Sequence, residues 1–401
     1  MERIHIAFFG PTNSGKSTLV NAIAGQRVSL VSDVPGTTTD PVRKAVELPG
    51  LGPCILIDTA GFDDRGILGT ERLRLTRAVL DETDVAVVLS MSPNEGHPQQ
   101  KGGQSAADVP DFGTLAAQAG IPVVRYTRGE SSESLLERIA AALPKEEERF
   151  LTGDLVKAGD TVLLVMPQDS EAPKGRLILP QVQVLRELLD RGCTPLCCTP
   201  QSLSAALAAL KALPALTITD SQVFGLVNRV LPTTAPLTSF SVLLAAAKGD
   251  AAVFVEGARA IGNLRPHSRV LIAEACTHVP NTEDIGRVKI PALLRKRVEM
   301  PGQAGHDAGS QAGHDAGSQA GHDAGSQAGH DAGLQVEIAA GNDFPEDLSP
   351  YDLIIHCGAC VATRTLVRAR TRKALLSGVP ITNYGIALAY LQGMLDRIVI
   401  P

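Results

Sequence analysis

The sequence predicts an α/β protein made of three consecutive α/β domains, and three observations support this fold class. With 401 residues, the chain is too long for one ordinary core, because domains commonly contain about 100–200 residues. Its composition is globular, with 44% apolar and 20% charged residues. Short apolar runs alternate with helical stretches along the whole chain, which is typical of mostly parallel sheets covered on both faces.

Composition and charge also exclude several classes of function. The net charge is −6, without a strong basic block, and aromatic residues make up only 3% with no Trp, so we expect no nucleic-acid binding by base stacking. No apolar run reaches the ~20 residues that a bilayer requires. We therefore expect a cytoplasmic protein without membrane attachment. Seven Cys residues in such a chain indicate thiols or metal ligands and not a disulfide framework.

The first domain is predicted over residues 1–155. Its expected strands are short, mainly apolar runs at 5–9, 54–57 and 85–89. The charged run at 145–149 marks its end. Because the strands are separated by helical stretches, the sheet is expected to be mostly parallel.

The second and third domains are predicted over 156–255 and 256–401. In the second, we expect a strand at 161–166, a helix at 181–191 and an Ala/Leu-rich helix at 201–212. The third contains apolar runs at 270–273, 336–339 and 352–355. Its helices are expected at 361–377 and 385–396. Both domains therefore share the α/β pattern of the first.

An eight-residue repeat interrupts the third domain. The unit Gln-Ala-Gly-His-Asp-Ala-Gly-Ser fills residues 303–333 in nearly four copies. Its histidines, His306, His314, His322 and His330, could bind a metal. The repeat is rich in Gly and Ala and lacks apolar periodicity, so a flexible loop insertion is the favoured interpretation.

Residues 10–17 carry a phosphate-binding motif. They read Gly-Pro-Thr-Asn-Ser-Gly-Lys-Ser, which matches G-x-x-x-x-G-K-[ST] between a predicted strand and a predicted helix. The glycines let the backbone N–H groups face an anion. Lys16 would supply charge to the β- and γ-phosphates, and the Ser17 hydroxyl would bind Mg²⁺. The nucleotide-binding residues expected here are Gly10, Asn13, Ser14, Gly15, Lys16, Ser17 and Thr18.

Two downstream segments supply what such a loop needs. Asp58 ends a predicted strand, which places its carboxylate near the metal, and Gly61 could sense a γ-phosphate through its N–H. Thr38 lies in a polar Thr-rich loop, where it could complete the Mg²⁺ shell only with a bound triphosphate, although a strand edge would also explain three consecutive Thr. Loops that a γ-phosphate orders form a switch. Lys16, Thr38, Asp58 and Gly61 are thus the predicted catalytic residues.

These residues resemble the translation-factor-related GTPases, in particular their Era-like branch. The resemblance implies GTP as substrate, and a K⁺ ion held by Asn13 in place of an arginine finger. Phe62 stands where Ras-like enzymes have a water-orienting Gln, so slow, K⁺-assisted hydrolysis is implied. The guanine-reading motif N-K-x-D is missing after the strand at 123–124, where residues 125–130 read Arg-Tyr-Thr-Arg-Gly-Glu. ATP therefore stays open as an alternative.

Cysteine and histidine side chains follow two strands of the third domain. Cys276 and His278 come after the run 270–273, and His356, Cys357 and Cys360 come after 352–355. Open α/β sheets gather ligand-binding loops at these strand ends. The residues fit an iron–sulfur cluster, a structural zinc or a redox C-x-x-C pair, and the iron–sulfur cluster is favoured. The other cysteines, Cys54, Cys193, Cys197 and Cys198, are expected to be small core residues.

Taken together, the motifs resemble those of the HydF family, the maturation GTPases of iron-only (FeFe) hydrogenases. The resemblance implies a P-loop GTPase domain, a middle domain that forms a homodimer and a C-terminal cluster domain. It implies a 4Fe–4S cluster on Cys276, Cys357 and Cys360, with His278 and His356 near the fourth position. The implied role is a scaffold that receives a di-iron precursor made by two radical-SAM maturases and delivers it to apo-hydrogenase.

Two other interpretations remain open at this point. Era-like domains also occur in GTPases that assemble ribosomes or bind RNA, but the acidic balance of this chain argues against that role. The missing guanine motif leaves room for a zinc-stabilised, ATP-dependent metal chaperone. Two measurements distinguish these interpretations: the affinity for GTP compared with that for ATP, and the metal content of the purified protein.

Overall fold

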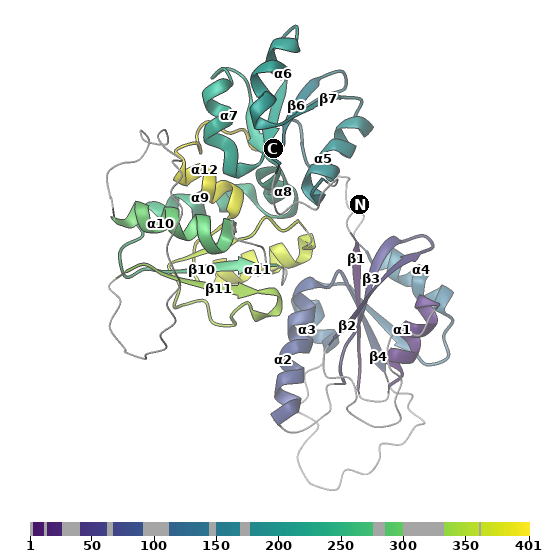
Figure 1. Cartoon of the computed structure of the whole chain (residues 1–401). Coiled ribbons are helices and arrows are strands. Elements are labelled where there is room, and N and C mark those ends of the chain that lie inside the picture. Colours follow the sequence, from purple (N-terminus) through teal and green to yellow (C-terminus); the bar gives the residue numbers. More distant parts are fainter. Residues whose placement is uncertain are drawn as a thin grey trace, which may run out of the picture. The chain divides into compact units, whose positions relative to one another are not determined.

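The computed structural model describes residues 3–11, 14–25, 41–61, 67–90, 112–143, 150–168, 177–275, 285–299, 333–360 and 362–401. The chain divides into two compact units (Figure 1). One comprises Met1–Glu148 with Ala362–Arg370, and the other comprises Arg149–Val361 with Thr371–Pro401. Each unit is α/β, as the sequence predicts.

The first unit contains a five-stranded sheet in the order β2-β3-β1-β4-β5. All neighbouring strands are parallel except β2 and β3, which are antiparallel. The strands are β1 (Ile4–Phe9), β2 (Val42–Leu48), β3 (Gly52–Asp58), β4 (Val85–Ser90) and β5 (Val123–Thr127). The helices are α1 (Lys16–Ala24), α2 (Ile67–Glu82), α3 (Phe112–Gln118) and α4 (Ser132–Ala142). The carboxyl ends of β1, β3, β4 and β5 therefore share one edge of the sheet.

The strand β2 is absent from the sequence-based prediction. Its residues alternate between exposed and half-buried positions along most of its length, because β2 lies at the edge of the sheet and pairs only with β3. An edge strand needs no continuous apolar run. A search for apolar runs consequently misses it.

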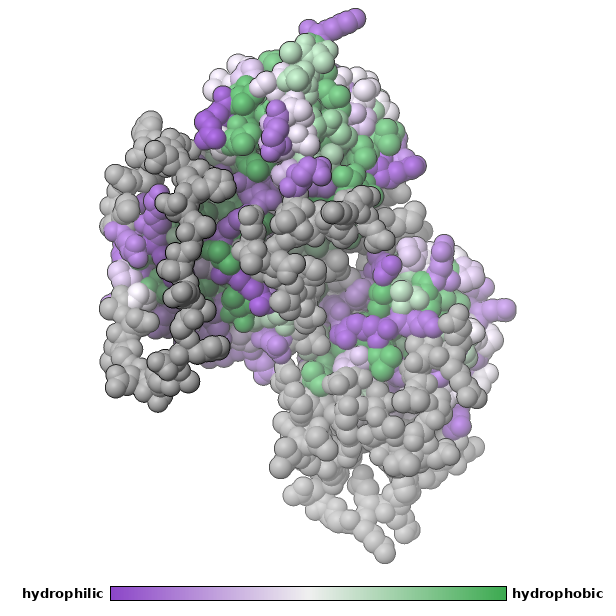
Figure 2. Space-filling model, in the orientation of Figure 1, coloured by the Kyte–Doolittle hydropathy of each residue, from purple (hydrophilic) through white to green (hydrophobic). Residues whose placement is uncertain are grey.

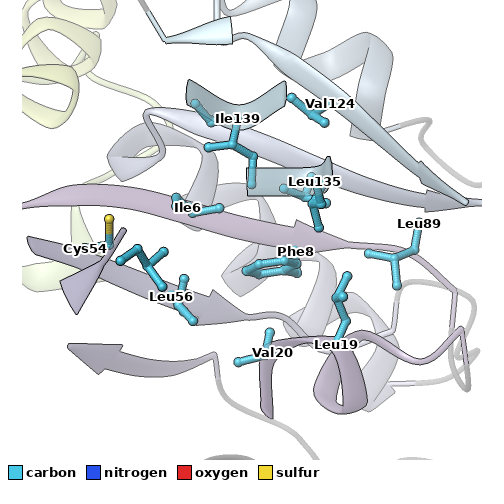
Figure 3. Close-up of a cluster of buried hydrophobic side chains, with 13 residues drawn as sticks. Ile6, Phe8, Leu19, Val20, Cys54, Leu56, Leu89, Val124, Leu135 and Ile139 are labelled. Atoms are coloured by element: carbon cyan, nitrogen blue, oxygen red, sulfur yellow. The ribbon is translucent and has the colours of Figure 1, made fainter. Parts of the chain in front are cut away.

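Alternating side chains of β1 enter two separate cores. Ile6 and Phe8 pack with Leu56 and with Leu135 of α4, as Figure 3 shows. On the opposite face, Phe9 stacks on Phe112 with ring centroids 5.3 Å apart. Fully burying each such side chain contributes about 1.5–3 kcal/mol. Both faces of the sheet are thereby covered, which keeps the strand ends in place.

The second unit begins with a parallel sheet in the order β7-β6-β8-β9. Its strands are β6 (Thr161–Val165), β7 (Thr194–Cys198), β8 (Leu216–Thr219) and β9 (Leu237–Ser239). Its helices are α5 (Leu179–Asp190), α6 (Leu203–Ala209), α7 (Phe224–Val230) and α8 (Phe240–Lys248). The predicted helices at 181–191 and 201–212 correspond to α5 and α6.

A second parallel sheet of this unit has the order β11-β10-β12-β13. Its strands are β10 (Arg269–Glu274), β11 (Gln335–Ala340), β12 (Leu353–His356) and β13 (Ile381–Asn383). The helices are α9 (Ala251–Arg259), α10 (Ile290–Glu299) and α12 (Tyr384–Leu391). Helix α11 (Arg364–Leu376) is divided, because its residues up to Arg370 are assigned to the first unit and the rest to the second. Residues 303–332 of the repeat lie outside the described part.

Helix α8 connects the two sheets of the second unit. The amide Nδ2 of Asn383, at the end of β13, donates to the carbonyl oxygen of Ser241 in α8 at 3.0 Å. Near the chain end, Gln392 donates to the carbonyl oxygen of Ser221 at 3.2 Å. These bonds join the two sheets into one packed body, although the bonded residues are more than 140 positions apart in the sequence.

Apolar side chains also reach the surface of the protein, as Figure 2 shows in green. Two of these lie on α5, Val182 and Leu189, which expose 46% and 54% of their accessible area. In the described residues, no helix combines the length and the apolar character that crossing a membrane requires.

Candidate functional site

The loop between β1 and α1 has the conformation that its glycines allow. Gly15 adopts a left-handed φ of 91° directly before α1, which residues with a Cβ rarely tolerate. At Gly10, an added Cβ would lie 2.8 Å from the Oγ of Ser14 and 3.1 Å from the Cβ of Leu89. The predicted strand and helix are therefore present on either side of the motif. A Cβ is disfavoured by the backbone conformation at Gly15 and by neighbouring atoms at Gly10.

Lys16 is held inside this loop. Its ammonium group is buried and donates hydrogen bonds to the carbonyl oxygens of Gly10 at 2.8 Å and Pro11 at 2.7 Å. Ser17 follows it in the first turn of α1 and is half-buried. The positive charge and the N-terminus of α1 thus meet at one point, which favours an anion such as a phosphate.

Asp58 brings a carboxylate to the same edge of the sheet. It is the last residue of β3 and pairs with Phe8 of β1. Its side chain is fully buried, and neither carboxylate oxygen has a hydrogen-bond partner within the described ranges. Its neighbour Thr59 donates to the carbonyl oxygen of Phe8 at 2.6 Å.

A magnesium ion fits these residues. Burying a carboxylate without a partner costs several kcal/mol, and carboxylate and hydroxyl oxygens are the ligands that Mg²⁺ uses. Asp58 and Ser17 would hold the ion. Asn13 and Thr38, the predicted K⁺ and Mg²⁺ ligands, lie outside the described residues, whereas Gly61 is described and half-buried.

The segment that replaces the guanine-reading motif follows β5. The carboxylate of Glu130 accepts hydrogen bonds from Arg138 at 2.8 Å and from the Ser134 hydroxyl at 3.1 Å. Arg138 also donates to the carbonyl oxygen of Arg125. These bonds fasten the end of β5 to α4 within the first unit.

The second predicted site lies at the ends of β10 and β12, which are neighbours in the sheet. The amide of Cys357 donates to the carbonyl oxygen of Ala273 at 2.9 Å, and the amide of Ala275 donates to the sulfur of Cys357 at 3.2 Å. His356 is buried, with its Nδ1 2.9 Å from the carbonyl oxygen of Cys357. The residue that contacts the Cys357 thiol, Ala275, therefore directly precedes Cys276 in the sequence.

A tight turn separates the two cysteines after β12. Ala359 adopts a left-handed φ of 54°, and its carbonyl oxygen accepts a hydrogen bond from the ammonium group of Lys248 at 2.9 Å. Cys357 and Cys360 are both half-buried. Sequence reasoning missed Lys248, because nothing in its own segment indicates a role for a lysine that ends an apolar helix.

These residues fit an iron–sulfur cluster. Thiolates are the ligands of such clusters, and amide hydrogen bonds to the sulfurs are among the features that tune them. Cys276 and His278 lie outside the described residues, and within the described ranges no group of three His, Cys, Asp or Glu side chains can hold a metal ion. Cys357 and Cys360, with the Ala275 amide, are the part of the predicted site that the structure brings together.

The four remaining cysteines fall into two groups. Cys54 and Cys193 are buried, as predicted, and burial raises the pKa of Cys54 to about 11. For Cys197 and Cys198 the prediction is wrong, because one is exposed and the other half-buried. They lie on β7, an edge strand, and a short apolar run does not reveal whether its strand lies at an edge.

Beside the turn lies a cavity of about 560 Å³. Cys360 and Gly358 line it together with Ser241 of α8 and Tyr384 of α12, and Cys197 and Cys198 belong to its wall. Strand ends from both sheets of the second unit thus meet around one cavity.

Comparison with protein families covers the chain in three parts. The family model described as "Hydrogen maturase F dimerization domain" matches residues 151–249. The model "Hydrogen maturase F tetramerization domain" matches 252–318 and 326–401. The model "50S ribosome-binding GTPase" matches residues 5–110.

Curated relatives match less than half of this chain. A tRNA modification GTPase MnmE of Methylobacterium sp. (strain 4-46) is 35% identical over 141 residues, which are 34% of this chain and 32% of that protein. The corresponding protein of Acidiphilium cryptum (strain JF-5) is 32% identical over 186 residues, 41% of each chain. The chain therefore spans well under half the length of these relatives.

Solved structures of GTPases are also similar in part. Era of Aquifex aeolicus bound to GDP and AlF4⁻ is 20% identical with a TM-score of 0.28, over 50% of this chain and 93% of that chain. NFeoB of S. thermophilus, bound to GDP, AlF4⁻ and K⁺, is 16% identical with a TM-score of 0.20, over 35% and 62%.

Proposed function

Because this chain belongs to the hydrogen maturase F family, we propose that it is a GTP-hydrolysing scaffold that carries a 4Fe–4S cluster during the maturation of FeFe-hydrogenase. The single observation that supports the cluster most directly is the contact between Ala275 and the thiol of Cys357. It joins the two strand ends from which the predicted ligands extend.

The nucleotide part of the proposal uses the first unit. Lys16 places its charge on the β- and γ-phosphates, Ser17 and Asp58 hold Mg²⁺, and the Gly61 amide contacts the γ-phosphate. Thr38 closes over the metal when triphosphate is bound, and Asn13 binds the K⁺ that assists hydrolysis. Phosphoryl transfer depends mainly on such positioning and charge, so no further nucleophile from the protein is required.

The metal part uses Cys276, Cys357 and Cys360 as cluster ligands, with His278 and His356 near the fourth position. When bound, the cluster supplies an iron site at which a di-iron precursor can be carried. The backbone of this chain orients the thiolates, since the amide of Ala275 and the turn at Ala359 determine where the Cys357 and Cys360 sulfurs lie. The proposed exchange partners are two radical-SAM maturases and apo-hydrogenase, in the cytoplasm.

The dimerization and tetramerization domains indicate an oligomer. We place the homodimer contact on the middle domain, where Val182 and Leu189 of α5 expose apolar area. The two residues are seven positions apart and so lie on the same side of the helix, and contiguous exposed apolar patches mark protein–protein contacts.

Anaerobic reconstitution with iron and sulfide tests the proposal. The purified protein is expected to bind about four iron and four sulfide ions per chain, to show the EPR signal of a reduced 4Fe–4S cluster, and to bind GTP more tightly than ATP. Cys357→Ser and Cys360→Ser should lose the cluster, whereas Cys197→Ser, at an exposed position in the wall of the same cavity, should retain it. About one zinc and no iron, with a preference for ATP, would support the zinc chaperone instead. Salt-sensitive RNA binding would support the RNA-associated GTPase.

A further inference from the structure

Lys248 occupies an unusual position for a lysine. It is the last residue of α8, whose other residues are mostly apolar, yet only 4% of its area is exposed. A lysine at a helix end usually extends its ammonium group into water. Burying an ammonium group is costly unless a compensating interaction is present. Its position therefore indicates a specific interaction inside the protein.

The ammonium group of Lys248 contacts the turn from Cys357 to Cys360, which we call the cysteine turn. It donates a buried hydrogen bond to the carbonyl oxygen of Ala359, 2.9 Å away and 111 positions later in the chain. Ala359 lies between Cys357 and Cys360 and has a left-handed φ of 54°, a conformation that costs energy for a residue with a Cβ. The bond from Lys248 stabilises this turn, and the turn determines where the two thiols lie.

The charge of Lys248 has a second consequence. A 4Fe–4S cluster bound by three thiolates carries a net negative charge, and reduction adds one further electron. A positive charge in a surrounding of low polarity stabilises the more negative state. Because its ammonium group contacts the turn between two of the proposed ligands, Lys248 lies where it can act on the cluster in this way.

We propose that Lys248 is a positioning residue of the cluster site, which holds the cysteine turn in its left-handed conformation and favours the reduced cluster. The inference depends on the proposed function, because it requires a cluster on Cys357 and Cys360. Lys248 lies within the segment that matches the dimerization domain, and Ala359 lies within the tetramerization domain. The middle domain thereby contributes a residue to the cluster site of the C-terminal domain.

Three variants of the full chain test this role. Lys248→Met keeps the length of the side chain and removes the charge and the donor, Lys248→Gln keeps a donor without the charge, and Lys248→Arg keeps the charge. Lys211→Met is the matched control, since Lys211 is exposed in the same domain. Each protein is reconstituted anaerobically, and its iron content, resistance to an iron chelator and midpoint potential are measured, together with the melting temperature without iron.

We expect Lys248→Met to hold the cluster about 10–100-fold more weakly, as for other residues that orient metal ligands. Its midpoint potential should be more negative than that of the wild type, and the potential of Lys248→Gln should shift in the same direction. Lys248→Arg should restore much of the wild-type potential, and Lys211→Met should change nothing. A purely structural role would lower the melting temperature without moving the potential.

Two outcomes contradict the inference in distinguishable ways. If the wild type holds the cluster and the Lys248→Gln protein has the same potential and chelator resistance, the role of Lys248 is wrong and the proposed function stands. If the wild type itself binds no iron–sulfur cluster, the proposed function and the role of Lys248 both fail. Should Lys248→Met not fold, Lys248→Gln and Lys248→Arg decide the question.

Discussion

The amide of Ala275 donates a hydrogen bond to the sulfur of Cys357, which lies 82 positions later in the chain. The bond is possible because β10 and β12 are adjacent and parallel, so that Ala273 pairs with His356. An N–H group that points at a sulfur stabilises its thiolate form. The contact therefore prepares Cys357 for metal binding and brings the Cys276 segment to it.

Lys16→Ala is expected to lower GTP hydrolysis by about 10²–10³-fold, because one positive donor to the transferred phosphate is lost. Iron content after reconstitution should stay the same, since Lys16 and the cysteines belong to different compact units. Phosphate release and iron content measured on the same preparation check both statements. A parallel fall in iron content would show that the two units depend on each other.

Asp58→Asn should separate catalysis from stability. The Mg²⁺ concentration needed for hydrolysis is expected to rise about 10–100-fold, because a charged oxygen near the metal is replaced by an amide. The protein without nucleotide should melt at the same or a higher temperature, since a buried carboxylate that has no partner among the described residues costs several kcal/mol. A lower melting temperature would mean that the carboxylate stabilises the fold.

Replacing K⁺ by Na⁺ at constant ionic strength should slow GTP hydrolysis, if Asn13 binds K⁺ as proposed. Asn13→Ala should hydrolyse GTP at the same slow rate in both salts. Initial rates of phosphate release measure the effect. Equal rates for the wild type in K⁺ and Na⁺ would remove this role from Asn13.

Glu82 makes the first unit sensitive to acid. Burial alone would raise its pKa, but the hydrogen bonds from Arg43 and the charges of Arg43 and of His5, whose Nδ1 lies 3.6 Å from the Oε2 of Glu82, outweigh burial, so the pKa of Glu82 lies below its usual 4.5. A lowered pKa means that this contribution to stability is complete above pH 4.5 and is lost as the pH falls through the folded-state value. Glu82→Gln should destabilise the unit by about 1–3 kcal/mol near neutral pH and by less in acid. Hydrogen exchange of the β1 amides at several pH values measures the difference, and a deficit that does not depend on pH would contradict it.

Thiol labelling should distinguish the cysteines by position. At pH 8, Cys197 is exposed and should react with a disulfide reagent while the protein is folded. Cys54 should react only after unfolding, because it is buried and its pKa is raised to about 11. Mass spectrometry of peptides from labelled protein reads out both sites. Rapid labelling of Cys54 in the folded state would contradict its burial.

Local pattern was sufficient for most elements and for one of the two sites. The apolar runs correspond to β1, β3, β4, β6, β10, β11 and β12, since a buried parallel strand requires such a run. The residues of the phosphate loop are adjacent in sequence, so Gly10, Gly15 and Lys16 could be assigned from spacing. The edge strand β2 and the exposure of Cys197 could not, because both depend on the order of strands in a sheet.

The sequence by itself determined the phosphate loop, the run of α/β domains and the residue types of a metal site, because each depends on neighbours within a few positions. Only the tertiary structure decided that the Ala275 amide meets the Cys357 sulfur, and that Lys248 reaches the turn at Ala359. The first contact joins residues that are 82 positions apart, and the second joins residues that are 111 positions apart. Such contacts depend on how whole sheets and helices pack. No local pattern encodes that packing.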